Sequence, residues 1–334
     1  MSTITSTKLE SPAVCPLDCA DTCSLNIELE NGKVSKVRGN SNNSFTRGKI
    51  CAKVVTALPE QVHGVDRLLH PMRRLGDRGP GAKFENLSWE EALNEIHTRF
   101  TKDIAAHGPA SIVPLSYGGP MGMLAGGSMD SRFFNQLGAR RVNSTTLCAG
   151  VADAAYGSLF GEAGGIPHAE FEHSKLIVIW GNNVTACNLH LTKIIREAQK
   201  GGAKLVVVDP KRVRIAEHAD LHLPLMPGTD VVLAYAIAAE LKRQGGLDED
   251  FIEKYVQGSA SYLEEAETFS LERAAEICGL KPEDIKQFAS YWKDIKPAAI
   301  NIGIGPERNR NGGSGIRAAL ALPVLTGNFG PLGA

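Results

Sequence analysis

The stretch KLIVIWGNNVTACNLHLTKIIREAQKGGAKLVVVDP, residues 175–210, decides the fold of this chain. It contains two short apolar runs, 175–181 and 204–210, and each of them ends in a turn residue. Between the runs, residues 188–200 repeat their apolar side chains with helical periodicity. A strand, a helix and a second strand in this order predict two parallel strands joined by a crossover helix.

The same alternation continues along the chain on both sides of this stretch. Short apolar runs bounded by turn residues indicate strands, and apolar residues at helical spacing indicate helices. The pattern predicts an α/β protein with doubly wound, mostly parallel sheets. Further strands are expected at 111–116, 222–225 and 298–305, and further helices at 230–245, within 248–293 and at 315–325.

Two local signals precede this region. Residues 24–38 alternate polar and apolar side chains around Asn31-Gly32, which predicts a β-hairpin. Ser88 and Glu91 have the spacing of a capping box, and apolar residues follow at helical spacing, so a helix is expected to start at Ser88.

Four cysteines near the N-terminus have the composition of a metal site. The nonapeptide CPLDCADTC places Cys15, Cys19 and Cys23 close together, and Cys51 follows in RGKICAKV. Four thiolates suit either zinc or a [4Fe–4S] cluster. Structural zinc usually takes two close pairs of ligands, whereas this set has three clustered thiols and one distant thiol. The spacing therefore favours an iron–sulfur cluster and leaves a zinc-stabilised binding protein as an alternative.

A radical enzyme that cleaves S-adenosylmethionine is a further alternative for clustered cysteines. Such enzymes use three cysteines, normally with a shorter second gap than the one between Cys19 and Cys23. This gap and the presence of Cys51 argue against that class.

Composition excludes several other classes. The chain has 334 residues, 43% apolar and 22% charged, as expected for a soluble protein of two or more domains. Its formal net charge of −1 provides no basic surface for nucleic acid and no polybasic patch for a membrane. No apolar run is long enough to span a bilayer and no signal sequence is evident, so we expect a cytoplasmic chain. An odd count of seven cysteines argues against a disulfide framework.

With these motifs in place, the sequence resembles the molybdopterin oxidoreductases of the dimethyl-sulfoxide-reductase type. The resemblance runs along the whole chain, and 206–238 carries its most specific part. The matching segments are the four cysteines ending in RGKICAKV, DRLLHPMRR (66–74), LSWEEAL (87–93), LIVIWGNNVTACNLH (176–190), VVVDPKRVRIAEHADLHLPLMPGTDVVLAYAIA (206–238) and LALPVLTGNFGPLGA (320–334).

The resemblance implies cofactors and a reaction. Cys15, Cys19, Cys23 and Cys51 would hold a [4Fe–4S] cluster, and molybdenum or tungsten would be carried on two molybdopterin guanine dinucleotides. The reaction would be a two-electron or oxygen-atom transfer with a small-molecule substrate, and the partner an electron carrier or an electron-transfer subunit. The alternative within the same fold is an electron-transfer or structural subunit without molybdenum, like the large cluster-bearing subunit of respiratory NADH dehydrogenases.

The residues expected to bind the dinucleotide follow the predicted strands. Ligands of doubly wound sheets bind beyond the carboxyl ends of the strands, and helix starts bind pyrophosphate through backbone N–H groups. Taken alone, Asp209 is better explained as a turn residue and Asp230 as a helix-start residue; the resemblance instead implies that they hold the guanosine end. The expected set is Trp180, Gly181, Asn182, Asn183, Asp209, Pro210, Lys211, Arg212, Pro227, Gly228 and Asp230.

Two further residues receive roles from the resemblance. Cys148 is the candidate metal ligand, since its spacing to Ala154 and Gly161 is that of the cysteine or selenocysteine branch, and a soft thiolate suits such a metal. Lys53 occupies the position between cluster and pterin where the family has a lysine or arginine that assists electron transfer. Formate dehydrogenases of the family place histidine after the metal ligand, so Ala149 argues against formate as the substrate.

We expect three domains. Residues 1–65 would form the [4Fe–4S] module, and 66–140 together with 300–334 one α/β domain. Residues 141–299 would form the doubly wound domain that binds the pterin dinucleotide. Because the family continues beyond the last motif, the chain is expected to be part of a longer protein.

Overall fold

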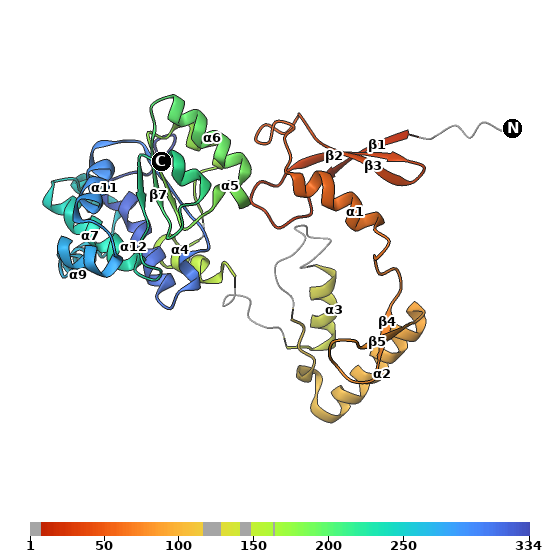
Figure 1. Ribbon diagram of the computed structural model, residues 1–334. Coiled ribbons are helices and arrows are strands. Elements are labelled where there is room, and N and C mark those ends of the chain that lie inside the picture. The colour runs from red at the N-terminus through yellow and green to blue at the C-terminus, as the bar shows by residue number, and fades with distance from the viewer. Residues whose placement is uncertain (1–7, 116–127, 141–147, 163) are drawn as a thin grey trace. The chain divides into compact units, whose positions relative to one another are not determined.

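The computed structural model describes residues 8–115, 128–140, 148–162 and 164–334 (Figure 1). The chain divides into two compact units. One contains residues 1–18 and 22–143, and the other contains residues 144–334 together with the short segment 19–21.

A small antiparallel sheet opens the first unit, in the order β1-β2-β3. The hairpin predicted around Asn31-Gly32 is confirmed, and both residues have the positive φ angles of a tight hairpin turn, 53° and 77°. The strand β1 was not predicted, because Pro12 interrupts its pattern; as an edge strand it tolerates a proline. The strands are β1 (Lys8–Val14), β2 (Ser24–Glu30) and β3 (Lys33–Gly39).

The rest of the first unit is mostly helical. The predicted helix start is confirmed: the Ser88 hydroxyl accepts the N–H of Glu91 at 3.2 Å, and the Glu91 carboxylate accepts the N–H of Ser88 at 2.8 Å. The elements are a π-helical turn (Lys53–Ala57), α1 (Leu58–His63), β4 (Met72–Leu75), β5 (Lys83–Asn86), α2 (Trp89–His107), a 3-10 turn (Pro109–Ser111) and α3 (Met129–Leu137).

The strand predicted at 111–116 is absent. Ser111 ends a 3-10 turn, residues 112–115 are irregular, and residue 116 lies outside the described residues. An extended run becomes a strand only when a neighbour completes its hydrogen-bond ladder, and none of the sheets in the described part of the chain includes this segment.

A four-stranded sheet forms the centre of the second unit. All its strands are parallel and lie in the order β8-β7-β6-β9, so the predicted parallel sheet is confirmed here. The strands are β6 (Leu176–Trp180), β7 (Lys204–Val208), β8 (Leu221–Leu223) and β9 (Ala298–Ile302).

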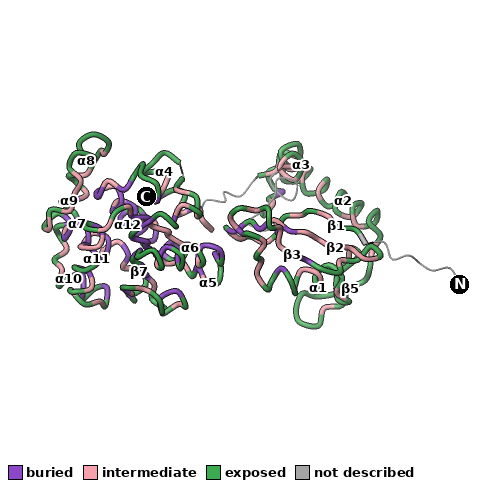
Figure 2. Tube along the Cα trace, turned by 90° about the horizontal axis from the view of Figure 1, so that it is seen from above, coloured by how far each residue is buried: buried purple, intermediate pink, exposed green. Residues whose placement is uncertain are grey.

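Helices cover both faces of this sheet, and the buried residues of the unit gather around it (Figures 1 and 2). Ile177 and Ile179 of β6 pack toward α6, whereas Val178 and Trp180 pack toward α7, α11 and α12. Burial on both faces explains why the strand sequences are continuous apolar runs. The helices are α4 (Gly150–Phe160), α5 (Val184–Cys187), α6 (Leu189–Lys200), α7 (Asp230–Arg243), α8 (Glu249–Tyr255), α9 (Ser259–Glu267), α10 (Leu271–Cys278), α11 (Pro282–Asp294) and α12 (Gly312–Leu325).

The C-terminal residues lie in a different unit from the one expected. Residues 300–334 were expected to group with 66–140, but β9 pairs with β6 and α12 packs against α7 within the second unit. The physical reason is the long-range pairing of β9, which the order of elements along the chain does not reveal. Among the described residues no helix is long and apolar enough to cross a lipid bilayer.

Candidate functional site

Two of the four N-terminal cysteines are brought together by the first sheet. Val14 and Ser24 form the last pair of the β1–β2 ladder, and Cys15 and Cys23 stand directly beyond it. The N–H of Cys15 donates to the carbonyl of Cys23 at 2.8 Å, which closes the loop that carries Cys19.

A turn folds Cys51 back toward this sheet. A Cβ atom on Gly39, at the end of β3, would stand 2.3 Å from the carbonyl oxygen of Gly48, so the two backbones touch where only glycine fits. The side chain of Asn43 holds the same turn by accepting the N–H groups of Phe45 and Thr46. Cys51 follows directly, at the start of the next helical turn.

Three of the thiols share one small apolar cluster. Cys15 and Cys23 are buried with Leu25 and Val54, and Cys51 packs against them half-buried. Cys19 lies in the segment that groups with the second unit, where its Sγ is 3.4 Å from the carbonyl of Cys187. Within the described residues, no group of three or more His, Cys, Asp or Glu side chains is already arranged around one metal position.

The segment 19–21 makes a buried polar contact inside the second unit. Asp21 is 3% exposed; it accepts a hydrogen bond from the Asn188 amide at 2.7 Å and faces Nδ1 of His190 at 2.9 Å. Burial alone would raise the pKa of Asp21, but the hydrogen bonds from His190 and Asn188 outweigh it and lower that pKa. The carboxylate is therefore held in its charged form. No spacing rule in the sequence indicated this contact.

A cavity of about 190 Å³ opens at the carboxyl ends of the second unit's strands. Among the residues predicted from the sequence, it brings together Gly181, Asp209, Pro210, Pro227 and Asp230. This is the edge at which doubly wound sheets bind ligands. The full lining is Gly181, Val208, Asp209, Pro210, Leu225, Pro227, Asp230, Gly305, Pro306 and Asn309.

Asp230 is the buried acid of this cavity, at the start of α7. Its Oδ1 accepts the indole N–H of Trp180 at 2.7 Å. Burial raises the pKa of Asp230, although the hydrogen bonds from Trp180 and from the Gly228 N–H oppose the rise. Trp180 itself is 1% exposed and packs in the core, so in this structure it orients Asp230 and does not line the cavity.

Asp209 is the second acid of the cavity, directly after β7. Its Oδ1 accepts the N–H of Lys211 at 2.8 Å, and its carbonyl lies 2.9 Å from Nε2 of His222. These bonds fix the turn, while Lys211 and Arg212 remain exposed beside it. A fixed acceptor next to two cations suits a ligand that carries both sugar hydroxyls and phosphate.

Asn182, Asn183 and Gly228 adjoin cavity residues in the second unit without lining the cavity. The Asn182 amide donates to Oδ1 of Asn301 at 2.6 Å, and Asn183 precedes the short helix α5. Gly228 has a φ of +86°, and a Cβ atom there would stand 3.5 Å from Asn309. Lys53 is exposed at the first position of its π-helical turn in the other unit.

The sequence pattern of the molybdopterin oxidoreductase family matches residues 67–333, and that of its Fe4S4 domain matches residues 10–62. The chain belongs to the molybdopterin oxidoreductase family. The resemblance found in the sequence is thereby confirmed, including its N-terminal Fe4S4 domain and its dimethyl-sulfoxide-reductase branch.

Relatives within this molybdopterin oxidoreductase family are longer proteins. The chain is 36% identical over 317 residues to the probable oxidoreductase YoaE of Bacillus subtilis, covering 95% of this chain and 46% of YoaE. It is 31% identical over 360 residues to the dimethyl sulfoxide reductase DmsA of Haemophilus influenzae, covering 95% and 44%. The structure of acetylene hydratase from Pelobacter acetylenicus superposes with a TM-score of 0.80 at 27% identity, covering 95% and 43%. The chain thus spans less than half the length of these relatives.

The residues at both places fit the groups that this molybdopterin oxidoreductase family binds, a [4Fe–4S] cluster and molybdopterin. Four thiols, three of them in one apolar cluster, are the donor set of an iron–sulfur cluster. At the cavity, two carboxylates and glycine backbone offer acceptors and close approach for a nucleotide. The fit rests on donor chemistry and on placement at the strand ends.

Cys148, the proposed metal ligand, stands two residues before α4 and is half-buried. It does not line the cavity described above. Its role in this chain remains a prediction, as do the roles of the other site residues.

Besides Val208 and Leu225, three lining residues were not predicted from the sequence: Gly305, Pro306 and Asn309. They follow β9, which was predicted as a strand. Applying the strand-end rule to 298–305 as well would have found them, because every parallel strand of the sheet ends at the same edge.

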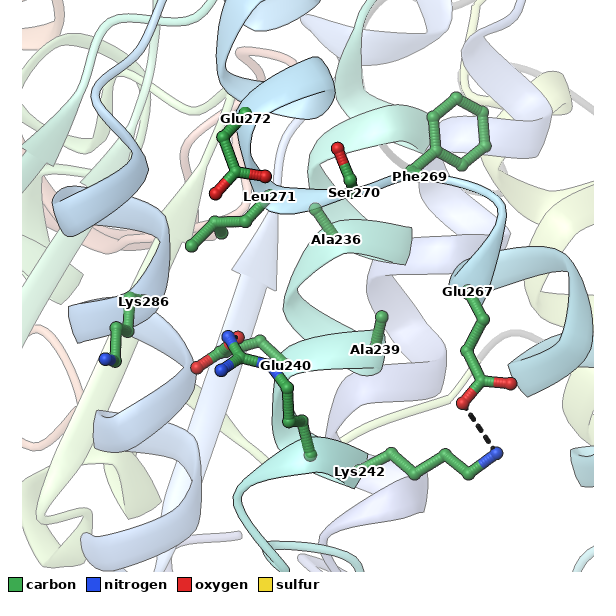
Figure 3. Close-up of a pocket in the computed structure, with 11 residues that line it drawn as sticks. Ala236, Ala239, Glu240, Lys242, Glu267, Phe269, Ser270, Leu271, Glu272 and Lys286 are labelled. Atoms are coloured by element: carbon green, nitrogen blue, oxygen red, sulfur yellow. Dashed lines mark ion pairs between the residues drawn. The ribbon is translucent and has the colours of Figure 1, made fainter.

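A larger hollow of about 720 Å³ lies on the C-terminal half of α7 (Figure 3). Lys242 and Glu267 form an ion pair of 2.7 Å at its rim, and Lys286 reaches it from α11. None of the residues predicted from the sequence lines it, so it carries no part of the candidate site. The lining is Ala236, Ala239, Glu240, Lys242, Arg243, Glu267, Phe269, Ser270, Leu271, Glu272 and Lys286.

The Trp180–Asp230 hydrogen bond gives a prediction that needs no cofactor. Trp180→Phe is expected to destabilise the second unit by about 1–3 kcal/mol beyond its packing cost, because it removes the side-chain donor to a buried carboxylate. Losing the donor raises the pKa of Asp230 further above its ordinary 3.8. The excess loss is therefore present at pH 7 and fades as the pH falls toward that value.

Urea unfolding at pH 7 and pH 4 measures this effect. Trp292→Phe is the matched control, because Trp292 is equally buried but its indole N–H has no hydrogen-bond partner among the described residues. Equal losses for the two substitutions at both pH values would show that the Trp180–Asp230 bond contributes nothing.

Proposed function

We propose that this chain is part of a molybdopterin-dependent oxidoreductase that carries out two-electron or oxygen-atom transfer at molybdenum or tungsten. A [4Fe–4S] cluster held by the N-terminal cysteines would supply the electron path between the metal and an external carrier or electron-transfer subunit. The observation that carries the proposal is the cavity at the strand ends, where two acids predicted from the sequence meet glycine backbone. Family membership supports the cofactor class.

The chain's own residues would hold these groups in defined ways. Cys15, Cys19, Cys23 and Cys51 are the cluster ligands, and Cys148 supplies a thiolate to the molybdenum. When bound, the metal site supplies the two-electron chemistry and the cluster a one-electron path.

The strand-end residues would bind the dinucleotide. Asp209 and Asp230 accept hydrogen bonds from the guanosine end, with Asp230 kept in place by Trp180. Lys211 and Arg212 stand where they can neutralise the pyrophosphate. Lys53, the second residue after Cys51, would lie on the electron path.

The sequence and the relatives limit the range of possible substrates only in part. Ala149 after Cys148 disfavours formate, since its methyl side chain cannot accept or donate a proton. The relatives include proteins named as a dimethyl sulfoxide reductase and an acetylene hydratase, so their names do not converge on one small molecule. We propose a small-molecule substrate of the molybdopterin oxidoreductase type without choosing among these.

Metal and nucleotide analysis of anaerobically purified protein tests the proposal. We expect about four iron atoms per chain, molybdenum or tungsten, and guanine nucleotide released on denaturation. Iron without molybdenum or tungsten would instead support an electron-transfer or structural subunit of the same fold. Colourless protein that contains zinc would contradict both readings of the cysteines.

A further inference from the structure

The helix that follows Cys148 begins without a cap of its own. The residue at the cap position of α4 is Ala149, which has no side-chain oxygen, and no side-chain cap bond forms there. The first N–H groups of a helix need acceptors, and serine, threonine or aspartate usually provide one. The acceptor for the start of α4 comes from elsewhere in the second unit.

Glu307 provides it from a turn 155 residues away. Its Oε2 accepts the N–H of Ala152, the third residue of α4, at 3.1 Å. The carboxylate also places a negative charge at the positive end of the helix dipole. In the sequence Glu307 lies in GIGPERNRNGG, where nothing marks it as a helix cap.

The packing around Glu307 leaves its side chain few polar partners. This side chain is fully buried, and its second oxygen, Oε1, makes no hydrogen bond within the described residues; the nearest cation is Nη2 of Arg308 at 3.7 Å. A Cβ atom on Gly312 would stand 2.5 Å from Cα of Glu307, so the start of α12 closes directly over this backbone. A buried carboxylate with so few partners is costly, which is a reason to look for a function.

The turn that carries Glu307 also borders the strand-end cavity of the candidate site. Pro306 precedes Glu307 and lines the strand-end cavity, as does Asn309 two residues after it. Ala155 of α4 packs against Ile316 and Leu320 of α12, so the helix is fixed on one side by apolar contact and at its start by Glu307.

We propose that Glu307 is a positioning residue for Cys148: by capping α4 from the cavity turn, it sets where the Cys148 thiol stands relative to the bound cofactor. This inference rests on the proposed function, in which Cys148 is the metal ligand. A cap carried on the cavity turn couples the thiol to the site, whereas a serine at position 149 would fix only the helix start. Because Glu307 provides the cap, position 149 can keep the apolar residue Ala149 directly after Cys148.

Alkylation of Cys148 in the protein without molybdenum tests the inference. Iodoacetamide labelling is followed by peptide mass spectrometry, with the exposed Cys187 of α5 as the internal reference. Loss of a helix cap frees the first turn, so we expect Glu307→Ala to speed Cys148 labelling about five- to tenfold at an unchanged Cys187 rate. Glu162→Ala, an exposed glutamate just beyond the other end of α4, is the matched control and should leave both rates unchanged.

Two conservative variants separate positioning from general stability. Glu307→Gln keeps an oxygen at the same reach and is expected to restore the slow rate. Glu307→Asp keeps the charge but is one methylene shorter, and should label as fast as the alanine variant. If Glu307→Ala does not fold, the Cys148 labelling rates of Glu307→Gln and Glu307→Asp decide whether Glu307 positions the thiol.

Wild-type labelling rates in both the Ala and Asp variants would overturn the inference, and so would equal acceleration of Cys187. The labelling requires neither metal nor turnover. A missing molybdenum signal in the metal analysis would therefore defeat the proposed function while leaving the role of Glu307 in placing Cys148 measurable.

Discussion

Substitution of Cys15 by alanine is expected to abolish iron binding and to unfold the N-terminal module, whereas substitution of Cys148 by serine leaves the iron content unchanged. Cys15 is buried in the small apolar cluster of the first sheet. That cluster is too small to stabilise the module by apolar burial alone. Ligand binding and folding are therefore coupled, and a lost ligand costs both.

Cys148 has a different environment. It stands before α4 in the second unit, outside the apolar cluster of the three N-terminal thiols. Serine replaces the soft thiolate by a harder ligand, so in an enzyme loaded with its cofactors activity should fall by a large factor. The division of the cysteines into a cluster set and a separate metal ligand is what the pair of variants examines.

Iron per chain and the visible absorbance that bleaches on reduction provide the measurement. Cys278→Ala is the control, because this cysteine, the last residue of α10, is fully buried in the core and belongs to neither set. It should retain full iron content. Loss of iron in Cys148→Ser, or full iron in Cys15→Ala, would show that the cysteines are divided incorrectly.

Much of the second unit could be predicted from the sequence because its strands are buried on both faces. Such strands read as unbroken apolar runs, and β6 and β7 are of this kind. The same signal fails at 111–116: Val113 and Leu115 are 51% and 76% exposed, and in the described part of this segment no neighbouring strand pairs with it. A short apolar run forms a buried strand only where neighbouring strands pair with it.

The spatial order of the strands could not be predicted from the sequence. The strand β9 lies beside β6 although more than a hundred residues separate them, and this pairing draws 300–334 into the second unit. Topology of this kind depends on which edge of the sheet is open, and no local pattern encodes that.

In the candidate site, too, some features could be predicted from the sequence and others could not. Asp209 and Pro210 follow a predicted strand and were found by the strand-end rule. The role of Trp180 in ligand binding stays a prediction; what no sequence pattern indicated is that its indole N–H donates to Asp230 from inside the core. The cap of α4 by Glu307 joins two distant segments and has no signature in either.

Gly181→Ala is expected to destabilise the second unit by about 2–4 kcal/mol and to weaken nucleotide binding at least about tenfold. Gly181 has a φ of +59°, and a Cβ atom there would stand 2.4 Å from Cδ of Pro306. The strain and the clash add, because neither the proline ring nor the end of β6 can move independently.

Two glycines that follow β9 also approach Gly181 closely. A Cβ atom on Gly303 would be 2.5 Å from the carbonyl oxygen of Gly181, and one on Gly305 would be 2.8 Å from it. The turns after β6 and β9 therefore touch backbone to backbone, and this contact forms one wall of the cavity. Alanine at 181 must push Pro306 away and so change the cavity.

Urea unfolding and calorimetric titration with guanosine diphosphate measure the two effects. Gly157→Ala is the matched control: it lies inside α4 with nothing within 4 Å of its Cβ position, so alanine should be neutral or stabilising. Equal stability and equal nucleotide affinity for the two variants would mean that the strand-end turns are not the binding wall. A stability loss without an affinity loss would separate the two roles of the contact, leaving it as packing and moving the nucleotide away from Pro306.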